Sequence, residues 1–233
     1  MYVLLAGLNH RTAPVEVREK LAFSDTVKKK AYEYLKKSPE IEGAVILATC
    51  NRTEVYATTR NIDSGTAVLN RFFKEFSGLT YSELQRYLYQ PSCYDAISHL
   101  FRVSSGLDSM ILGEAQILAQ VKEAYQTAME NGVSDGVLNA LFQKAIFVGK
   151  KTRTETGIDQ HPVSVSYAAV ELARQHFQSL EDKTVLIVGA GEMSELATRY
   201  LMVNGVRSVI VSNRSFDRAQ KMAQSFNGRA VQF

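Results

Sequence analysis

The segment "TVLIVGAGEMS", residues 184–194, constrains the fold of this chain more than any other. Its apolar, β-branched start is typical of a buried strand, and an amphipathic stretch that stops near Gly205 follows the glycines. A strand, a tight turn and a helix in this order are the context in which G-x-G-x-x-G binds a dinucleotide. Gly189 permits the turn, Gly191 lets the backbone approach the pyrophosphate, and the helix N-terminus faces the negative charge. The sequence therefore predicts a Rossmann-like βαβ unit.

Two details of this unit bear on its cofactor. Ser194 stands at the third position of the motif, where glycine or alanine is usual, and is small enough for close helix packing. The next apolar run, "SVIVS", ends at Asn213 and Arg214, where an acidic residue would meet a ribose 2′-hydroxyl. An arginine suits a 2′-phosphate, so we expect NADPH rather than NADH. The expected cofactor contacts are Gly189, Ala190, Gly191, Glu192, Met193, Ser194, Asn213 and Arg214. The alternative is a Rossmann-like unit without a cofactor.

Composition and charge limit the classes of protein to consider. The 233 residues are 45% hydrophobic and 22% charged, as in an ordinary globular protein, and the net charge of +3 permits a nucleic-acid partner without requiring one. Cys50 and Cys93 are too few for a disulfide framework and indicate a reducing compartment, so we expect a cytoplasmic protein. We expect no membrane span, no signal peptide and no metal site.

The part of the chain before residue 156 mixes strands and helices. The run "YVLLAGL" at 2–8 predicts a strand, and "SDTVKKKAYEYLKK" predicts a helix capped by Ser24. The runs "GAVILATC" and "TEVYATT" predict a hairpin with Cys50 at its bend. A helical stretch follows over residues 64–154.

A change of texture in "TGIDQHPV", residues 156–163, predicts a domain boundary. We expect a mixed α+β domain over 1–156 and an α/β, Rossmann-like NADP-binding domain over 157–233. A complete dinucleotide-binding fold has two mononucleotide halves, and the sequence after "VIVSNR" supplies only the first. The sequence thus predicts a truncated second domain and a shortened form of a longer protein.

The stretch "LATCNRTEVY", residues 47–56, places Cys50 at the end of an apolar run and two positions before Arg52. Unpaired cysteines are usually buried and inert, so a core role is the default interpretation and a nucleophile is the alternative. A free thiol has a pKa near 8.5 and is only about 3% thiolate at neutral pH, so a nucleophile benefits from a cationic neighbour. Arg52 is close enough in sequence to be that neighbour, and is otherwise a solvated turn residue.

Four segments together carry a family resemblance: "GLNHRTAPVEVREKLAF", "LATCNRTEVYA", "HLFRVSSGLDSMILGEAQILAQVKEAY" and "TVLIVGAGEMS". In their order and spacing, over essentially the whole chain, the sequence resembles glutamyl-tRNA reductases. The motifs "TCNRTE" and "GLDSMILGEAQI" are more specific than the glycine motif, which unrelated folds share. The resemblance implies that a cysteine attacks glutamate esterified to its tRNA. NADPH then reduces the thioester to glutamate-1-semialdehyde, the first step of five-carbon tetrapyrrole (haem) synthesis.

The resemblance also implies roles for individual residues. Cys50 is the nucleophile, His99 assists in acid–base chemistry, and Arg52 binds the glutamate carboxylate. The implied substrate contacts are Thr49, Asn51, Arg52, Ser109, Glu114, Ala115, Gln116 and Gln120. From the residues alone, His99 is a structural helix histidine, and the stripe of Gln116 and Gln120 faces solvent. We expect a helix to begin at Gly113–Glu114, where a carboxylate suits the positive end of the helix dipole.

The implied partners are glutamyl-tRNA and the downstream aminomutase, with no membrane. The family has an N-terminal catalytic domain, an NADPH domain and a helical dimerisation domain, so the intact protein is expected to be a homodimer. The dimerisation domain is absent from this sequence. The basic runs Lys28–Lys30 and Lys150–Arg153 are interpreted as solvated helix faces, with contacts to tRNA phosphates as the alternative.

Two other functions compete with this interpretation. An NADP-dependent dehydrogenase similar to shikimate dehydrogenase shares the "GAG" turn and the "NR" strand end, but works without tRNA and without Cys50. A non-catalytic module that binds tRNA or a regulator is the other candidate, and it would form no covalent intermediate.

Overall fold

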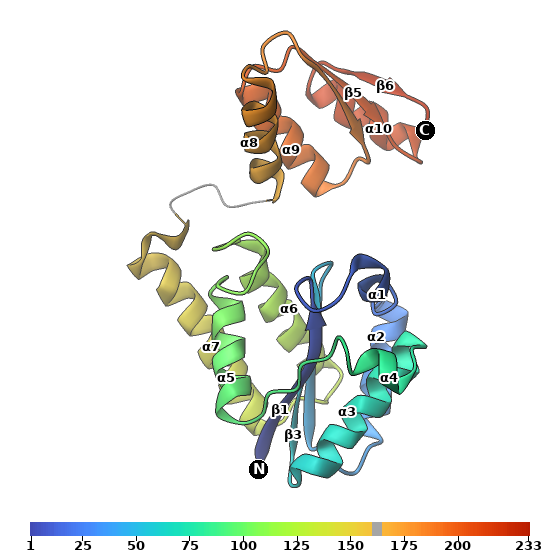
Figure 1. Cartoon of the computed structure of the whole chain (residues 1–233), viewed down its shortest axis with the longest axis vertical. Helices are drawn as coiled ribbons and strands as arrows, with labels where there is room; N and C mark the ends of the chain where they lie inside the picture. The colour runs from blue at the N-terminus through green and yellow to red at the C-terminus, as the bar shows by residue number, and fades with distance from the viewer. Residues whose placement is uncertain (160–164) are drawn as a thin grey trace. The chain divides into compact units, whose positions relative to one another are not determined.

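The computed structural model describes residues 1–159 and 165–233, and the chain divides into two compact units, Met1–Gln160 and His161–Phe233 (Figure 1). The predicted boundary segment 156–163 lies partly outside the described residues, and a boundary between 156 and 157 stays a prediction. Within the described ranges, every helix is too short or too polar to pass through a lipid bilayer.

The first unit is built on a three-stranded antiparallel sheet. Its order is β1 (Tyr2–Asn9), β3 (Arg52–Thr59) and β2 (Gly43–Ala48), so β3 lies in the centre. All eight residues of β3 are buried, because helices cover both faces of the sheet. β2 and β3 form the predicted hairpin, with Ala48 opposite Thr53 beside the turn.

Two groups of helices cover this sheet (Figure 1). One face carries α2 (Asp25–Lys36) and α3 (Ile62–Ser77), with α1 (Val15–Glu19) and α4 (Tyr81–Leu84) on the same side. The other face carries α5 (Tyr94–Ser104), α6 (Gln116–Glu130) and α7 (Gly136–Glu155), and a short 3₁₀ turn at Gly157–Asp159 follows.

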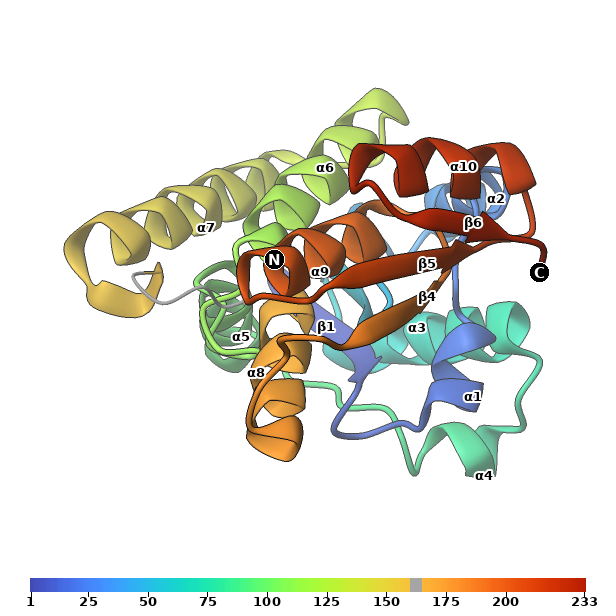
Figure 2. The same cartoon turned by 90° about the horizontal axis from the view of Figure 1, so that it is seen from above.

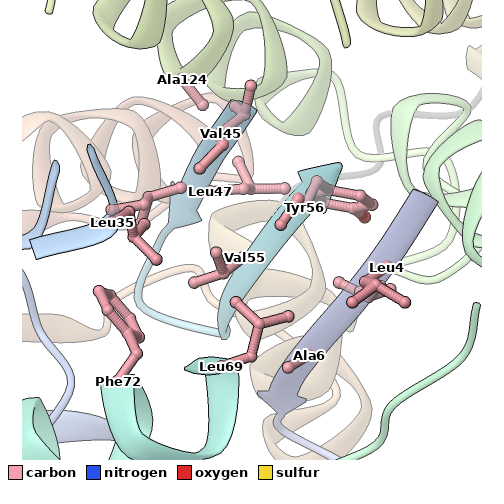
Figure 3. Packing of buried hydrophobic residues seen from close by; sticks show 14 of the residues in the cluster. Leu4, Ala6, Leu35, Val45, Leu47, Val55, Tyr56, Leu69, Phe72 and Ala124 are labelled. Carbon is pink, nitrogen blue, oxygen red and sulfur yellow. The ribbon is translucent and has the colours of Figure 1, made fainter. Parts of the chain in front are cut away.

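Alternate residues of β3 point into the two layers. The ring of Tyr56 packs edge-on against Phe142 of α7, with ring centroids 5.4 Å apart. Val55 points to the opposite side, among leucine and phenylalanine side chains of α2 and α3 (Figure 3). Because side chains alternate along a strand, Arg52 and Glu54 share the face of Tyr56.

The second unit contains a parallel sheet of order β4 (Thr184–Val188), β5 (Ser208–Ser212) and β6 (Arg229–Val231), with β5 between the other two (Figure 2). α9 (Glu192–Val203) connects β4 to β5, α10 (Phe216–Ser225) connects β5 to β6, and α8 (Val165–Phe177) packs against α9. The predicted fold class, a mixed α+β unit followed by a Rossmann-like unit, is confirmed.

The start of α6 differs from the prediction. The expected start at Gly113–Glu114 is wrong, because α6 begins at Gln116 with Ala115 as its N-cap residue. Gly113 has a left-handed φ of 80°, and its N–H donates to the Gly106 carbonyl over 3.0 Å. This turn keeps Glu114 outside the helix.

Gly149 of α7 packs closely against the end of α5. A Cβ at Gly149 would lie 2.5 Å from the backbone oxygen of Ser104. Alanine normally stabilises a helix relative to glycine, but here the two helices would have to separate. We expect Gly149→Ala to lower the free energy of unfolding by about 1–3 kcal/mol in urea titrations followed by circular dichroism.

Gly136, at the start of the same helix, is the matched control, because a Cβ there would meet no atom within 4 Å. Gly136→Ala should leave stability unchanged or slightly higher. Equal losses in both variants would contradict the packing explanation.

Candidate active site around Cys50

The turn that carries Cys50 is held by the residue before it. The N–H of Thr49 donates to the Arg52 carbonyl over 2.8 Å, and Thr49 Oγ1 accepts the N–H groups of Asn51 and Arg52, each over 3.1 Å. Cys50 lies at the tip of this turn and is exposed. The interpretation of Cys50 as a buried core residue is therefore wrong, and the residue is accessible to a substrate.

Two segments from earlier in the chain lie against this turn. Arg18 of α1 donates through Nη1 to the Cys50 carbonyl over 2.5 Å and to Asn51 Oδ1 over 3.2 Å. The N–H of His10 donates to the Asn51 carbonyl over 2.9 Å. Arg18 was not among the predicted site residues, since an arginine in a short polar helix has no signal of its own.

Arg52, in contrast, points into the protein and is only 2% exposed. Its Nη1 donates to Glu54 Oε1 over 2.7 Å, and its Nη2 donates to Asp108 over 2.6 Å at the carbonyl and 3.1 Å at Oδ2. The interpretation of Arg52 as a solvated turn residue is wrong. Asp108 also accepts hydrogen bonds from Asn9 and Arg11. It therefore links β3 to the end of β1 and to the loop that follows β1.

Glu54 is fully buried and accepts hydrogen bonds on both oxygens. Oε1 receives the Tyr89 hydroxyl over 2.6 Å and faces His99 Nε2 over 2.8 Å, and Oε2 receives the Tyr56 hydroxyl over 2.7 Å. Burial alone would raise the pKa of Glu54, but the charge of Arg52 and the hydrogen bond and charge of His99 outweigh it and lower the pKa from 4.5 to about 2. Glu54 is therefore ionised at neutral pH. Burial and the Glu54 charge raise the pKa values of Tyr56 and Tyr89, so both hydroxyls keep their protons.

The ionised Glu54 holds the ring of His99 through one nitrogen. A carboxylate can only accept, so the hydrogen between the two groups belongs to His99 Nε2. The ring also packs on Tyr89, with centroids 5.3 Å apart, and the side chain is 18% exposed. The described residues offer Nδ1 no hydrogen-bond partner.

Two of the predicted substrate residues, Ser109 and Glu114, lie near the Arg52 cluster, whereas Gln120 lines a different cavity. Ser109, next to Asp108, is buried, and its hydroxyl has no partner among the described residues. Burial raises the pKa of Glu114, and the charge of Arg52 offsets part of this effect. Gln120 instead lines a cavity of about 120 Å³ between α2, β2 and α6. Ala115 and Gln116 form the start of α6.

Glu54 and Asp108 were missed in the sequence, although one signal for Glu54 was present. Polar side chains alternate with apolar or small ones along this strand, at Arg52, Glu54 and Tyr56. This alternation places a guanidinium and a carboxyl group on the same buried face. No local signal marks Asp108, which lies 56 residues from Arg52 in the chain.

The glycine turn of the second unit lies beside the end of the next strand. β4 and β5 are parallel, with Val188 opposite Ser212, so the turn after β4 and Asn213–Arg214 after β5 occupy the same edge of the sheet. The N–H of Gly189 donates to the Ser212 carbonyl over 2.7 Å. Gly191 is the N-cap residue of α9, and Glu192 is the first residue of that helix.

An exposed cysteine on a hairpin turn in an α+β unit, followed by a Rossmann-like unit with a glycine turn, defines a class of two-unit proteins that join a cysteine site to a nucleotide-binding fold. The chain belongs to the glutamyl-tRNA reductase family, since residues 6–156 match the family model described as glutamyl-tRNAGlu reductase, N-terminal domain. Residues 171–233 match the model for shikimate / quinate 5-dehydrogenase. The resemblance found in the sequence motifs is confirmed.

Individual proteins give the same result. The glutamyl-tRNA reductases of Pelotomaculum thermopropionicum and Carboxydothermus hydrogenoformans are 59% and 54% identical to the chain, covering 100% of it and 52% of each relative. A solved structure of glutamyl-tRNA reductase from Methanopyrus kandleri is 40% identical with a TM-score of 0.64, and the match covers 99% of this chain and 54% of that one. The chain thus spans about half the length of the relatives it matches.

The lowered pKa of Glu54 predicts a pH-dependent contribution to stability. Because the folded-state pKa of about 2 lies below the ordinary 4.5, the stabilisation is complete above pH 4.5 and is lost as the pH falls toward 2. We expect Glu54→Gln to lower the free energy of unfolding by about 3 kcal/mol at pH 7, and the difference from the wild type to shrink between pH 5 and 2.

The matched control is Glu42→Gln, which breaks the surface ion pair of Glu42 with Arg60. It should cost less than about 1 kcal/mol. A Glu54→Gln difference that does not change with pH would contradict the ionised state of this carboxyl group.

Proposed function

We propose that this chain forms a glutamyl thioester on Cys50 from glutamyl-tRNA and binds NADPH in its second unit, as part of glutamyl-tRNA reductase chemistry. The observation that carries the proposal is the exposed Cys50 at the tip of a hydrogen-bonded turn, next to the buried Arg52 cluster, in a chain of this family. The similar proteins from Pelotomaculum thermopropionicum and Carboxydothermus hydrogenoformans are named glutamyl-tRNA reductases. We assign the reaction to this chain on the basis of that similarity.

The proposed first step is an acyl transfer. The Cys50 thiol gives its proton to His99 Nδ1, and the sulfur attacks the carbonyl carbon of glutamate on the terminal ribose. A C–S bond forms, the C–O ester bond breaks, and the leaving ribose oxygen takes the proton back from His99. The products are a glutamyl thioester and tRNA with a free hydroxyl.

The buried cluster would orient the groups around this step. Glu54 holds the ring of His99 through Nε2, and the Arg52 guanidinium lies on Asp108 and acts electrostatically on Glu114. We assign the substrate pocket to Thr49, Asn51, Arg52, Ser109, Glu114, Ala115 and Gln116. A substrate contact of Gln120, which lines the cavity beside Ala48, stays a prediction from the family. A cytoplasmic location, a homodimer and an aminomutase partner remain predictions from the family.

The glycine turn has the features that a dinucleotide requires. Gly189 has φ of +106°, in the region that favours glycine, and a Cβ on Gly191 would meet no atom within 4 Å, which leaves room at the start of α9. Residues 189–194 would hold the pyrophosphate, and Asn213 and the exposed Arg214 would meet the adenosine ribose and its 2′-phosphate. When bound, NADPH supplies the hydride that reduces the glutamyl group to glutamate-1-semialdehyde.

A second candidate is an oxidoreductase similar to shikimate dehydrogenase, since residues 171–233 match that family model. The match is confined to the second unit. Oxidation of a small cyclic acid without tRNA, persisting in Cys50→Ser, would support this function over the first.

We expect Cys50 to become acylated when the chain is mixed with glutamyl-tRNA. Mass spectrometry of the peptide should show a glutamyl adduct that hydroxylamine removes, and Cys50→Ser should abolish it. The control is Cys93→Ser, because Cys93 is half-buried at the start of α5 and belongs to no predicted site. Binding of charged tRNA without any adduct would favour a non-catalytic module.

We expect the chain to bind NADPH more tightly than NADH, because Arg214 offers a guanidinium where an acidic residue would select NADH. Arg214→Asp should weaken NADPH by about tenfold or more and leave NADH much less affected, as measured by cofactor fluorescence. Arg218→Asp is the control, since Arg218 is also exposed but lies in α10. Equal affinities of the wild type for both cofactors would contradict the assignment.

A further inference from the structure

Arg18 contacts the Cys50 turn and still has N–H donors that bind no acceptor among the described residues. Its Nη1 is occupied by the Cys50 carbonyl and the Asn51 side chain. Its Nε is buried and lacks a partner, and the described residues supply no acceptor for Nη2. A buried N–H without an acceptor costs free energy, so a guanidinium in this state is suited to an additional ligand.

The charge of Arg18 is also uncompensated. Arg52 faces two carboxylates, and Arg11 faces Asp108 over 3.2 Å. Among the described residues, no carboxylate forms an ion pair with Arg18. Of these three arginines around the hairpin, Arg18 alone has its positive charge available to a ligand.

The free donors lie on one edge of the guanidinium. Nε–H and one N–H of Nη2 point in parallel, which is the arrangement that binds two oxygens of a phosphate or carboxylate. Because Nη1 is fixed on the turn, the group is held in place before a ligand arrives. The site therefore favours an anionic group that presents two oxygens side by side, close to Cys50.

The proposed substrate has such a group at a suitable distance. Six bonds separate the ester carbonyl carbon from the phosphorus on the 5′ side of the same terminal ribose, a span of roughly 9 Å at most with bonds near 1.5 Å. Arg18 Nη1 lies 2.5 Å from the carbonyl oxygen of Cys50 itself. An ester positioned at the sulfur thus brings its phosphodiester within range of this side chain.

We propose that Arg18 binds the phosphodiester next to the terminal ribose of glutamyl-tRNA, an inference that rests on the proposed thioester function. The site selects esters carried on a nucleotide over other glutamyl esters. The glutamate side chain of the substrate is assigned to the predicted pocket beside the Arg52 cluster, which leaves Arg18 for the phosphodiester.

The test compares acylation of Cys50 by 3′-O-glutamyl adenosine with and without a 5′-phosphate, measured by mass spectrometry on the full chain. The wild type should react about tenfold faster with the phosphorylated ester. In Arg18→Gln the ratio of the two rates should fall to about one, whatever the variant does to the unphosphorylated ester through its lost contacts with the turn, and Arg18→Lys should keep part of the advantage. Arg60→Gln is the matched control, because Arg60 pairs with Glu42 on the surface and should retain the full phosphate effect.

Each other outcome overturns the inference in a recognisable way. If the phosphate gives the wild type no advantage, or if Arg18→Gln slows both esters equally, Arg18 only supports the turn. If Arg18→Gln instead removes the preference for glutamyl over glutaminyl esters, it binds the glutamate carboxylate. Should Arg18→Gln fail to fold, protection of wild-type Cys50 by adenosine 5′-monophosphate but not by adenosine decides the question. No adduct with glutamyl-tRNA in the wild type would refute the proposed function itself.

Discussion

A guanidinium keeps its charge even when it is only 2% exposed, so its burial is costly unless carboxylates face it, and Arg52 meets two of them. Glu54 comes from the same strand, whereas Asp108 comes from the segment between α5 and α6. Asp108 also accepts from Asn9 at the end of β1 over 3.3 Å. The ion cluster thus ties β1, β3 and the α5–α6 segment together at the strand residue next to the Cys50 turn, and the local geometry of the candidate site depends on it.

The cluster also determines which charges a substrate can meet. Arg11 and Arg52 form their ion pairs with Glu54 and Asp108, so two guanidinium groups face two carboxyl groups. Arg18 takes no part in these ion pairs and lies on the turn itself. The site therefore contains two different cations. Arg52 is buried, holds the structure together and offsets part of the rise that burial causes in the pKa of Glu114, whereas Arg18 is half-buried and has hydrogen-bond donors without partners among the described residues.

The parts of this arrangement that follow local rules were predictable from the sequence. Runs of β-branched residues on both sides of "NR" gave the hairpin and the place of Cys50, and the glycine turn gave the βαβ unit. Because parallel strands end at the same edge of a sheet, the proximity of Arg214 to the glycines also followed. The burial of Arg52 could not be predicted in this way, since it depends on Asp108, which lies 56 residues away in the chain and meets Arg52 only in the folded structure. The start of α6 was misplaced because Gly113 bonds back to Gly106 in a turn that precedes the helix.

At Cys50, the backbone holds the turn in place and the sulfur is left for chemistry. Its hydrogen bonds use the side chain of Thr49, backbone groups of Asn51 and Arg52, and the carbonyl oxygen of Cys50, while the sulfur takes part in none of the hydrogen bonds among the described residues. Replacing the sulfur therefore leaves the scaffold intact, so an effect of that change reports on chemistry. Arg52 and Glu54 are different, because each is both a neighbour of the candidate site and a buried charge whose loss leaves its partner uncompensated. Their roles can be separated only by readouts that a loss of stability does not move, such as the pH dependence of the acylation rate.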